Sequence, residues 1–160
     1  MSTTPECEPI VDSSLGQELE KGECQILSTV MEVKHLKDGE ILVKEGQEDH
    51  TLFVLTAGKL AVSSIIDKKD VTVYNMKVGE CAGTRAFVDR APRRATLKAV
   101  GDTTVYTLKP EAFETLLDTH PRIVYKVMRG LFRITHMNLM RMNVETQQLS
   151  NYINKTGGRY

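Results

Sequence analysis

The middle of the chain has the hydrophobic pattern of a small all-β fold. Between residues 32 and 108, short runs rich in β-branched and aromatic residues alternate with turn dipeptides, most of which contain glycine. The predicted strands are Glu32–Leu36, Ile41–Lys44, Thr51–Thr56, Lys59–Ile66, Asp70–Met76, Ala95–Val100 and Thr103–Leu108. Many short strands at regular spacing are typical of a β-sandwich or a β-barrel. Apolar and polar side chains alternate imperfectly, which indicates that both faces are partly covered.

Helical patterns precede and interrupt the strands. Leu19, Leu27 and Val30 recur at roughly helical spacing and predict a short helix before the first strand. The interval 83–89, GTRAFVD, contains no β-branched run and predicts a single helical turn. Pro92 prevents that turn from continuing, because proline cannot donate the helical hydrogen bond.

The last third of the chain is predicted to be helical. Pro110 suits the first position of a helix that ends before Pro121, and a second helix then shows no strong breaker until Gly157. We therefore divide the chain into a flexible arm (1–14), a barrel with its adjoining helices (15–120) and a long helix (121–156).

The long helix carries two apolar stripes. The first alternates steps of three and four residues, a spacing typical of a two-helix seam, and consists of Tyr125, Met128, Phe132, Thr135, Leu139, Met142, Thr146, Leu149 and Ile153. The second occupies another face and consists of Val124, Val127, Leu131 and Ile134. A helix with two apolar faces needs two partners, so we expect the second stripe to pack on the barrel and the first on a second copy of the chain. The predicted dimer contacts are Met128, Phe132, Thr135, Leu139, Met142 and Leu149. The alternative is a helix that folds entirely onto its own domain.

The segment that carries chemistry begins at Gly83, where a predicted strand meets the helical turn. Glycine lets backbone approach a ligand closely, and the free amides at a helix start attract anions. Arg93 follows Pro92 and can fork onto a phosphate, while Ala95 leaves room and Thr96 adds a hydroxyl. These residues predict a phosphate cradle with amides on one side and a guanidinium on the other.

This segment resembles the phosphate-binding cassette of the cyclic nucleotide-binding domain family, which includes the bacterial catabolite activator and the regulatory subunits of cyclic-AMP-dependent kinase. The family pattern Phe-Gly-Glu-x-Ala, then Pro-Arg-x-Ala-Thr, aligns without a gap with residues 82–86 and 92–96, and the glycines at 39, 46 and 58 match its barrel turns. The resemblance implies a mainly β fold, a double-stranded β-helix (jelly-roll) barrel with flanking helices. It also implies the ligand-binding residues Gly83, Thr84, Arg85, Ala86, Arg93, Arg94, Ala95 and Thr96.

Thr84 departs from the family pattern. Members that bind cyclic nucleotides tightly place a glutamate here, and its carboxylate accepts a hydrogen bond from the ribose 2′-hydroxyl. Two functions therefore stay open. The chain is a regulatory module that binds cyclic AMP, cyclic GMP or a similar phosphate-bearing ligand and signals through its long helix to a partner, or it is a dimerisation scaffold with a vestigial pocket.

Composition narrows the remaining classes of function. The 21 basic residues balance the 21 acidic ones, which argues against a basic nucleic-acid surface. No helix-turn-helix follows the long helix, so direct DNA binding is not expected, and no catalytic motif predicts an enzyme. We also expect no secretory signal, no membrane span and a cytoplasmic location.

The three cysteines, Cys7, Cys24 and Cys81, are odd in number and widely spaced. They predict reduced thiols, with no disulfide framework and no metal site. Haem bound through His136 or Cys81 has little support, and no cofactor is expected.

Overall fold

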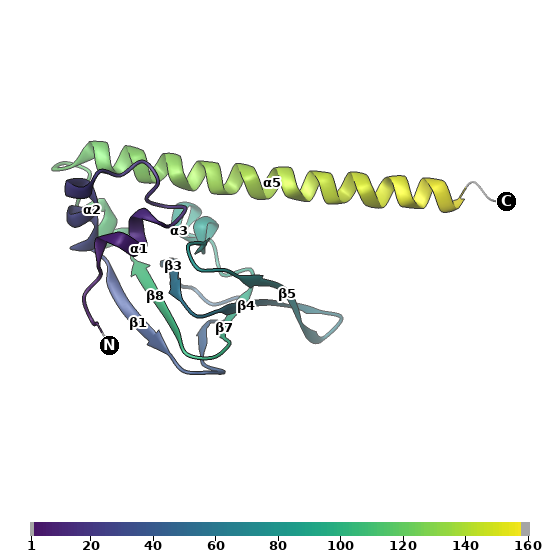
Figure 1. The fold of residues 1–160 in the computed structure, drawn as a ribbon. Helices are drawn as coiled ribbons and strands as arrows, with labels where there is room; N and C mark the ends of the chain where they lie inside the picture. Colours follow the sequence, from purple (N-terminus) through teal and green to yellow (C-terminus); the bar gives the residue numbers. More distant parts are fainter. Residues whose placement is uncertain (1, 158–160) are drawn as a thin grey trace.

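The strands form two four-stranded antiparallel sheets that face each other as a flattened barrel (Figure 1). A computed structural model describes residues 2–157. One sheet has the order β1-β8-β3-β6 and the other β2-β7-β4-β5. The strands are β1 (Glu32–Leu36), β2 (Ile41–Val43), β3 (Leu52–Ala57), β4 (Leu60–Ile66), β5 (Lys69–Met76), β6 (Cys81–Ala82), β7 (Thr96–Ala99) and β8 (Thr103–Leu108). All seven predicted strands are confirmed, while β6 was missed because two residues are too few to show a pattern.

Strand β3 explains the imperfect alternation. Phe53 and Leu55 point into the barrel, whereas Leu52 and Val54 point outward into a second apolar cluster beneath the helices. All four side chains are buried, with 3 % exposure or less. The strand therefore reads as a continuous apolar run, since each face of its sheet is covered.

Five helices surround one side of this barrel: α1 (Cys7–Val11), α2 (Lys21–Ser28), α3 (Thr84–Asp89), α4 (Pro110–Glu114) and α5 (Pro121–Gly157). A capping box between Glu20 and Glu23 starts α2, and Pro110 occupies the first turn of α4 as predicted. The turn predicted for 83–89 is confirmed as α3. No helix among residues 2–157 combines the length and apolarity that a bilayer span requires.

The expectation of a flexible arm over residues 1–14 was wrong for its second half. Residues 7–11 form α1, and Ile10 is completely buried in the cluster beneath the helices. The expectation of unpaired thiols was also wrong for Cys7 and Cys24, which form a disulfide. The two residues are 17 positions apart in the chain, and only the packing of α1 against α2 brings them together.

The first half of α5 is fastened to the rest of the domain. Val127 and Leu131, from the second apolar stripe, are buried in the cluster beneath the helices, with Val124 and Ile134 packed at its edge. Gly130 lets the helix approach closely, because a Cβ there would lie 3.0 Å from the carbonyl oxygen of Leu15. The packing predicted for this stripe is thus confirmed.

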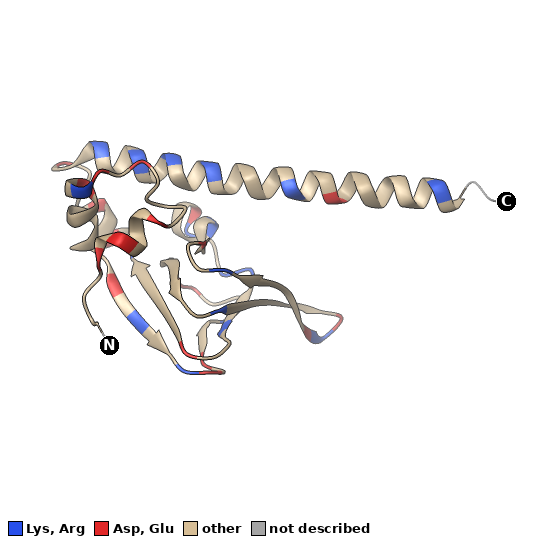
Figure 2. Ribbon diagram, in the orientation of Figure 1, with Lys and Arg blue, Asp and Glu red and all other residues tan. Residues whose placement is uncertain are grey.

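Ion pairs reinforce this packing. Lys126 Nζ lies 2.5 Å from Glu23 Oε1, and Arg133 Nη2 lies 2.5 Å from Glu18 Oε1. The hydrogen bond from Arg133 lowers the pKa of the Glu18 carboxyl. Figure 2 shows the basic positions spaced along α5 and acidic positions on the N-terminal segment beside its first turns.

The C-terminal turns of α5 extend away from the domain. Beyond Ile134 every described residue of the helix is exposed, and Figure 1 shows the end of the helix as a rod that projects past the barrel. Seam residues such as Phe132 (72 % exposed), Leu139 (54 %) and Leu149 (60 %) are uncovered in the single chain.

Candidate functional site

A cavity of about 450 Å³ lies between the β2-β7-β4-β5 sheet, α3 and the middle of α5. Seven of the eight predicted ligand-binding residues line it: Gly83, Thr84, Arg85, Ala86, Arg93, Arg94 and Ala95. Its walls also include apolar side chains of the strands, among them Val43, Val62, Met76 and Leu97. The cavity therefore pairs an apolar wall with a polar end, the usual composition of a small-molecule site.

The cassette loop begins with a glycine that no other residue could replace without strain. Gly83 has a φ of +85°, and a Cβ added to it would collide with Nη1 of Arg93. The first hydrogen bond of α3 runs from the Phe87 amide to the Gly83 carbonyl at 2.9 Å. The amides of Thr84, Arg85 and Ala86 precede this bond, so helix geometry leaves them without intrahelical partners beside the cavity.

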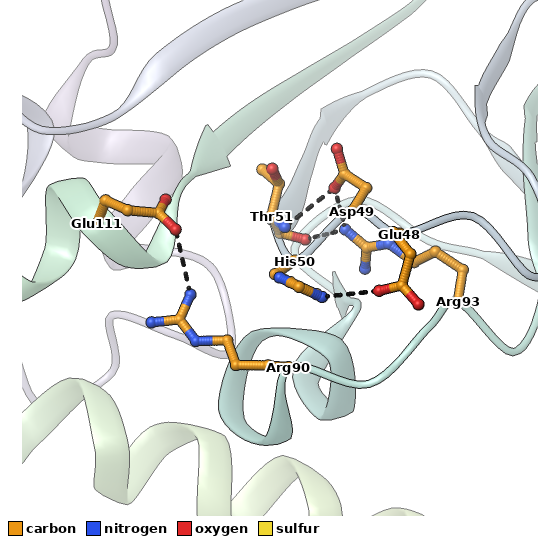
Figure 3. Close-up of polar contacts among 7 residues, drawn as sticks. All are labelled: Glu48, Asp49, His50, Thr51, Arg90, Arg93 and Glu111. Atoms are coloured by element: carbon orange, nitrogen blue, oxygen red, sulfur yellow. Dashed lines mark hydrogen bonds and ion pairs between the residues drawn. The ribbon is translucent and has the colours of Figure 1, made fainter.

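Arg93 lies against this glycine and is 5 % exposed. Its Nη2 donates to Asp49 Oδ1 at 2.6 Å and to the carbonyl oxygen of Thr51 (Figure 3). Its guanidinium carbon lies 4.9 Å from the Phe53 ring centroid. Its Nε and Nη1 are buried and have no hydrogen-bond partner among residues 2–157. One nitrogen thus fixes the guanidinium, and two remain available.

Asp49 orients this guanidinium and is itself held by the fold. Its Oδ1 also accepts from the Thr51 amide at 3.0 Å. Burial opposes ionisation of Asp49, but the hydrogen bonds from Arg93 and Thr51 outweigh it and keep the pKa of the carboxyl below its usual value. Asp49 therefore stays charged at neutral pH and holds Arg93 in place.

Contacts with α4 hold helix α3 in place. The Phe87 and Phe113 rings lie 5.5 Å apart, which joins α3 to α4. Arg90, just after α3, donates to Glu114 Oε1 at 2.6 Å. It also donates to Glu111 Oε1 at 3.4 Å, and Figure 3 shows this second contact. These contacts anchor α3, whose first residues line the same cavity as Arg93.

Three of the eight predicted ligand-binding residues either lie outside the cavity or are exposed at its edge. Thr96 does not line the cavity, because its hydroxyl accepts a hydrogen bond from the Glu45 amide at 3.0 Å. Arg85 lines the rim but is exposed and pairs with Asp89 on its own helix at 3.9 Å. Arg94 is an exposed side chain at the mouth. Only Arg93 among the cassette arginines is buried.

The opposite end of the cavity is polar, and the sequence analysis did not predict it. The Tyr74 hydroxyl lies 2.8 Å from both carboxylate oxygens of Glu80, and this hydrogen bond, together with burial, raises the pKa of Tyr74. Arg141, from α5, lies over the Tyr74 ring with its guanidinium carbon 5.2 Å from the centroid. Asn138 from the same helix also lines this end. We call Tyr74, Glu80, Asn138 and Arg141 the far wall.

A family model, described as the cyclic nucleotide-binding domain, matches residues 33–120, which include all of the barrel after the first strand residue and the whole cassette. The chain belongs to the cyclic nucleotide-binding domain family. A cAMP-dependent protein kinase regulatory subunit from Hypocrea atroviridis is 30% identical over 137 residues, and a cGMP-dependent protein kinase from Eimeria tenella is 25% identical over 135. The matches cover 86% and 84% of this chain but only 26% and 13% of those proteins.

Solved structures share the fold of this cyclic nucleotide-binding domain. A cyclic nucleotide-binding domain from Methylobacillus flagellatus kt aligns with a TM-score of 0.76 and 22% identity, covering 84% of this chain and 76% of that one. The catabolite activator protein of Thermus thermophilus gives the same score and identity, with 86% and 63% covered. The predicted jelly-roll fold class is confirmed.

Within this cyclic nucleotide-binding domain, Thr84 lies at the first position of α3 and lines the cavity, as the cassette alignment implies. The side chain ends in a neutral hydroxyl where the family pattern has a carboxylate. Cys81 is the free thiol of this domain and also lines the cavity, but burial raises its pKa to about 12. The thiol is therefore neutral, and a thiolate nucleophile or ligand is disfavoured.

No group of three or more potential metal-ligating side chains occurs within residues 2–157.

The far-wall residues, which were not predicted, gave little local signal in the sequence. Tyr74 and Glu80 lie in and after a strand whose side chains alternate weakly, and Arg141 follows 61 positions later on a helix that the sequence assigns to dimerisation.

Proposed function

We propose that this domain binds a cyclic nucleotide, or a similar phosphate ester, with its phosphate between Arg93 and the first amides of α3. The observation that carries the proposal is the pair of unpartnered nitrogens, Nε and Nη1, on a guanidinium that is 5 % exposed. A buried charge that lacks hydrogen bonds is costly, and the oxygens of a phosphate would accept hydrogen bonds from these charged nitrogens.

The second part of the proposal is regulation without catalysis. Ile134, Met137, Asn138 and Arg141 bring α5 against the same cavity, so a ligand that contacts them favours one position of the helix. A ligand shifts such an equilibrium only through its different affinities for the two positions. The helix then alters contacts with a partner protein, and the uncovered seam on its outer face forms a homodimer.

Calorimetric titration of the full chain with cyclic AMP and cyclic GMP tests the binding proposal. We expect saturable binding that Arg93→Ala abolishes and Arg93→Lys weakens strongly, because lysine keeps the charge but not the fork. Arg122→Ala is the matched control, since Arg122 is exposed on the first turn of α5 and lies away from the cavity. Circular dichroism verifies that each variant is folded. The absence of heat for both nucleotides with folded wild-type protein would overturn the proposal.

A second candidate function rests on Thr84. If the pocket is vestigial, it no longer binds nucleotide and the domain serves as a dimerisation scaffold. Sedimentation of the wild type with and without cyclic nucleotide, together with the titration above, distinguishes the two functions. A change in association or shape supports regulation, whereas identical sedimentation without measurable binding supports the scaffold.

A further inference from the structure

The disulfide between Cys7 and Cys24 closes a loop of the N-terminal segment. The Cα atoms of the two cysteines lie 5.6 Å apart, a normal separation for a disulfide, and the bond joins α1 to the first half of α2. The chain between the two helices is the part of this loop that reaches other elements of the domain. We call residues 12–15 the connecting segment.

The connecting segment contacts both the cavity and α5. The Ser14 amide donates to the Gly79 carbonyl oxygen at 2.9 Å, in the turn that leads into β6 and the cassette, and Ser14 also lines the cavity. On its other side, the carbonyl oxygen of Leu15 lies where a Cβ on Gly130 of α5 would be only 3.0 Å away. The position of this segment therefore affects one wall of the cavity and the seat of α5.

The two helices that the bond joins are held with unequal strength. Helix α2 is fixed by its capping box, by the ion pair between Glu23 and Lys126, and by Leu27, which is completely buried. Helix α1 has five residues, no side-chain cap and one buried side chain, Ile10. A helix of this length is not stable alone, so its position depends on tertiary contacts. The disulfide ties α1 to the more firmly held α2 and thereby opposes release of the connecting segment.

The two sulfur atoms differ in their access to solvent. Cys24 is completely buried, whereas Cys7 is half-buried. An incoming thiolate therefore attacks Sγ of Cys7, and a mixed disulfide forms as Cys24 leaves with the electron pair and takes a proton from water. A second thiol attacks the mixed disulfide, frees the Cys7 thiol and leaves the reductant as its own disulfide. Two electrons thus pass from two thiols to the cysteine pair.

The third cysteine does not disturb this exchange. Cys81 lies on β6, and burial raises the pKa of its thiol to about 12. A neutral thiol is a poor nucleophile, so Cys81 does not attack the bond and the pairing of Cys7 with Cys24 is kept.

We propose that Cys7 and Cys24 form a redox-sensitive clasp. The disulfide form holds α1 and the connecting segment against Gly79 and Gly130, and in the dithiol form this part of the chain separates from the domain far more often. Its release removes the cavity wall at Ser14 and the close packing on α5. A low-molecular-weight thiol or a protein dithiol thus loosens α5 by acting on Cys7. The proposal goes beyond the proposed function and requires no bound ligand.

Hydrogen exchange measured by mass spectrometry on the full chain tests the clasp. The protein is compared before and after treatment with reduced glutathione at neutral pH, and mass spectrometry without reductant first measures the fraction that carries the bond. Amides of residues 7–16 should exchange about 100-fold faster after reduction, because a cross-link over a loop of this length shifts an opening equilibrium by about this factor. Amides of α5 around Gly130 should also exchange faster. Strand β7, which lies in the other sheet, is the internal reference and should not change.

Cys7→Ser provides the matched control. Serine keeps the size of this half-buried side chain and removes the bond, so the variant should show fast exchange of residues 7–16 both with and without glutathione. Equal exchange in oxidised and reduced wild-type protein would overturn the inference. A bond that glutathione reduces only in denatured protein, an oxidised preparation that lacks the bond, or a response to glutathione that persists in Cys7→Ser would overturn it as well. A failure of nucleotide binding would overturn the proposed function and leave the clasp intact.

Discussion

The two ends of the cavity are built in different ways. At the phosphate end, Gly83, Arg93 and Asp49 come from loops that the barrel and α4 hold rigidly, and every one of these residues has its main contacts inside the domain. At the far wall, Tyr74 comes from the edge strand β5 and Arg141 from the exposed half of α5. Under the proposed function, the phosphate end therefore holds the ligand at a fixed site, whereas the far wall brings the ligand against α5.

The largest effect is expected from Gly83→Ala. The new Cβ would collide with Nη1 of Arg93 and lie 3.0 Å from the Thr51 carbonyl oxygen, at a φ of +85°. We expect all nucleotide affinity to fall by roughly 100-fold or more, because the guanidinium must leave its position. Gly39→Ala is the matched control, since Gly39 has a φ of +82° but no neighbour within 4 Å of an added Cβ. Equal calorimetric affinities for the two variants would contradict a fixed phosphate end.

The second largest effect is expected on the free energy of unfolding, from a substitution of Asp49. Asp49→Asn keeps an acceptor for Arg93 and removes only the charge, so we expect the free energy of unfolding at neutral pH to fall by about 1–3 kcal/mol. Because Asp49 has a lowered pKa in the folded protein, its contribution is complete above the unfolded pKa of about 4 and is lost as pH falls through the folded pKa. Denaturant unfolding measured from pH 7 downward should show a constant difference between the two proteins above about pH 4, and the difference should shrink as pH falls further.

Asp118→Asn, an exposed aspartate without an ion pair among the described residues, controls for the loss of net charge. A wild-type stability advantage that persists below the folded pKa, or an equal loss in both variants, would show that Asp49 does not orient Arg93 through its charge.

A substitution at Thr84 is expected to increase the affinity for cyclic nucleotides. Thr84→Glu restores the carboxylate of the family pattern, and a charge-assisted hydrogen bond of roughly 1.5–3 kcal/mol corresponds to a gain of about 10- to 100-fold. The gain should be absent for 2′-deoxy nucleotides and for Thr84→Gln, which has the length but not the charge. A loss of affinity in Thr84→Glu would instead show that the threonine is a specialised contact.

The smallest effect on nucleotide affinity is expected from a substitution on the outer face of α5. Leu139→Glu places a charge in the middle of the proposed seam, so we expect a monomer in analytical ultracentrifugation and a change in nucleotide affinity of less than about threefold. Gln148→Glu adds the same charge on another face and should remain dimeric. A dimer in Leu139→Glu would exclude this seam as the interface.

The same contrast determines how much of the site could be predicted from the sequence. The cassette is local: Gly83 starts a turn, Pro92 stops it and Arg93 follows, so its spacing is visible along the chain. Seven of the eight strands were predictable to within one residue because turn residues, most often including a glycine, bound them. The contacts of Asp49 and Arg141 depend on how separate elements pack, and a single sequence carries no pattern for them.

The N-terminal segment is a second case in which tertiary packing leaves no pattern in the sequence. Its serines, threonines and proline are typical of a loose arm, yet Ile10 is buried and Cys7 is joined to Cys24. A helix of five residues has no periodicity to detect, and its stability comes from tertiary packing rather than from propensity.

The central claim is that the two free nitrogens of Arg93 receive a phosphate. A crystal structure of the full chain grown with saturating cyclic GMP measures this most directly. The account predicts a phosphate oxygen within hydrogen-bond distance of Nε or Nη1 of Arg93 and of at least one amide from Thr84 to Ala86. Density that places the phosphate elsewhere, with those two nitrogens still unpartnered, would contradict it.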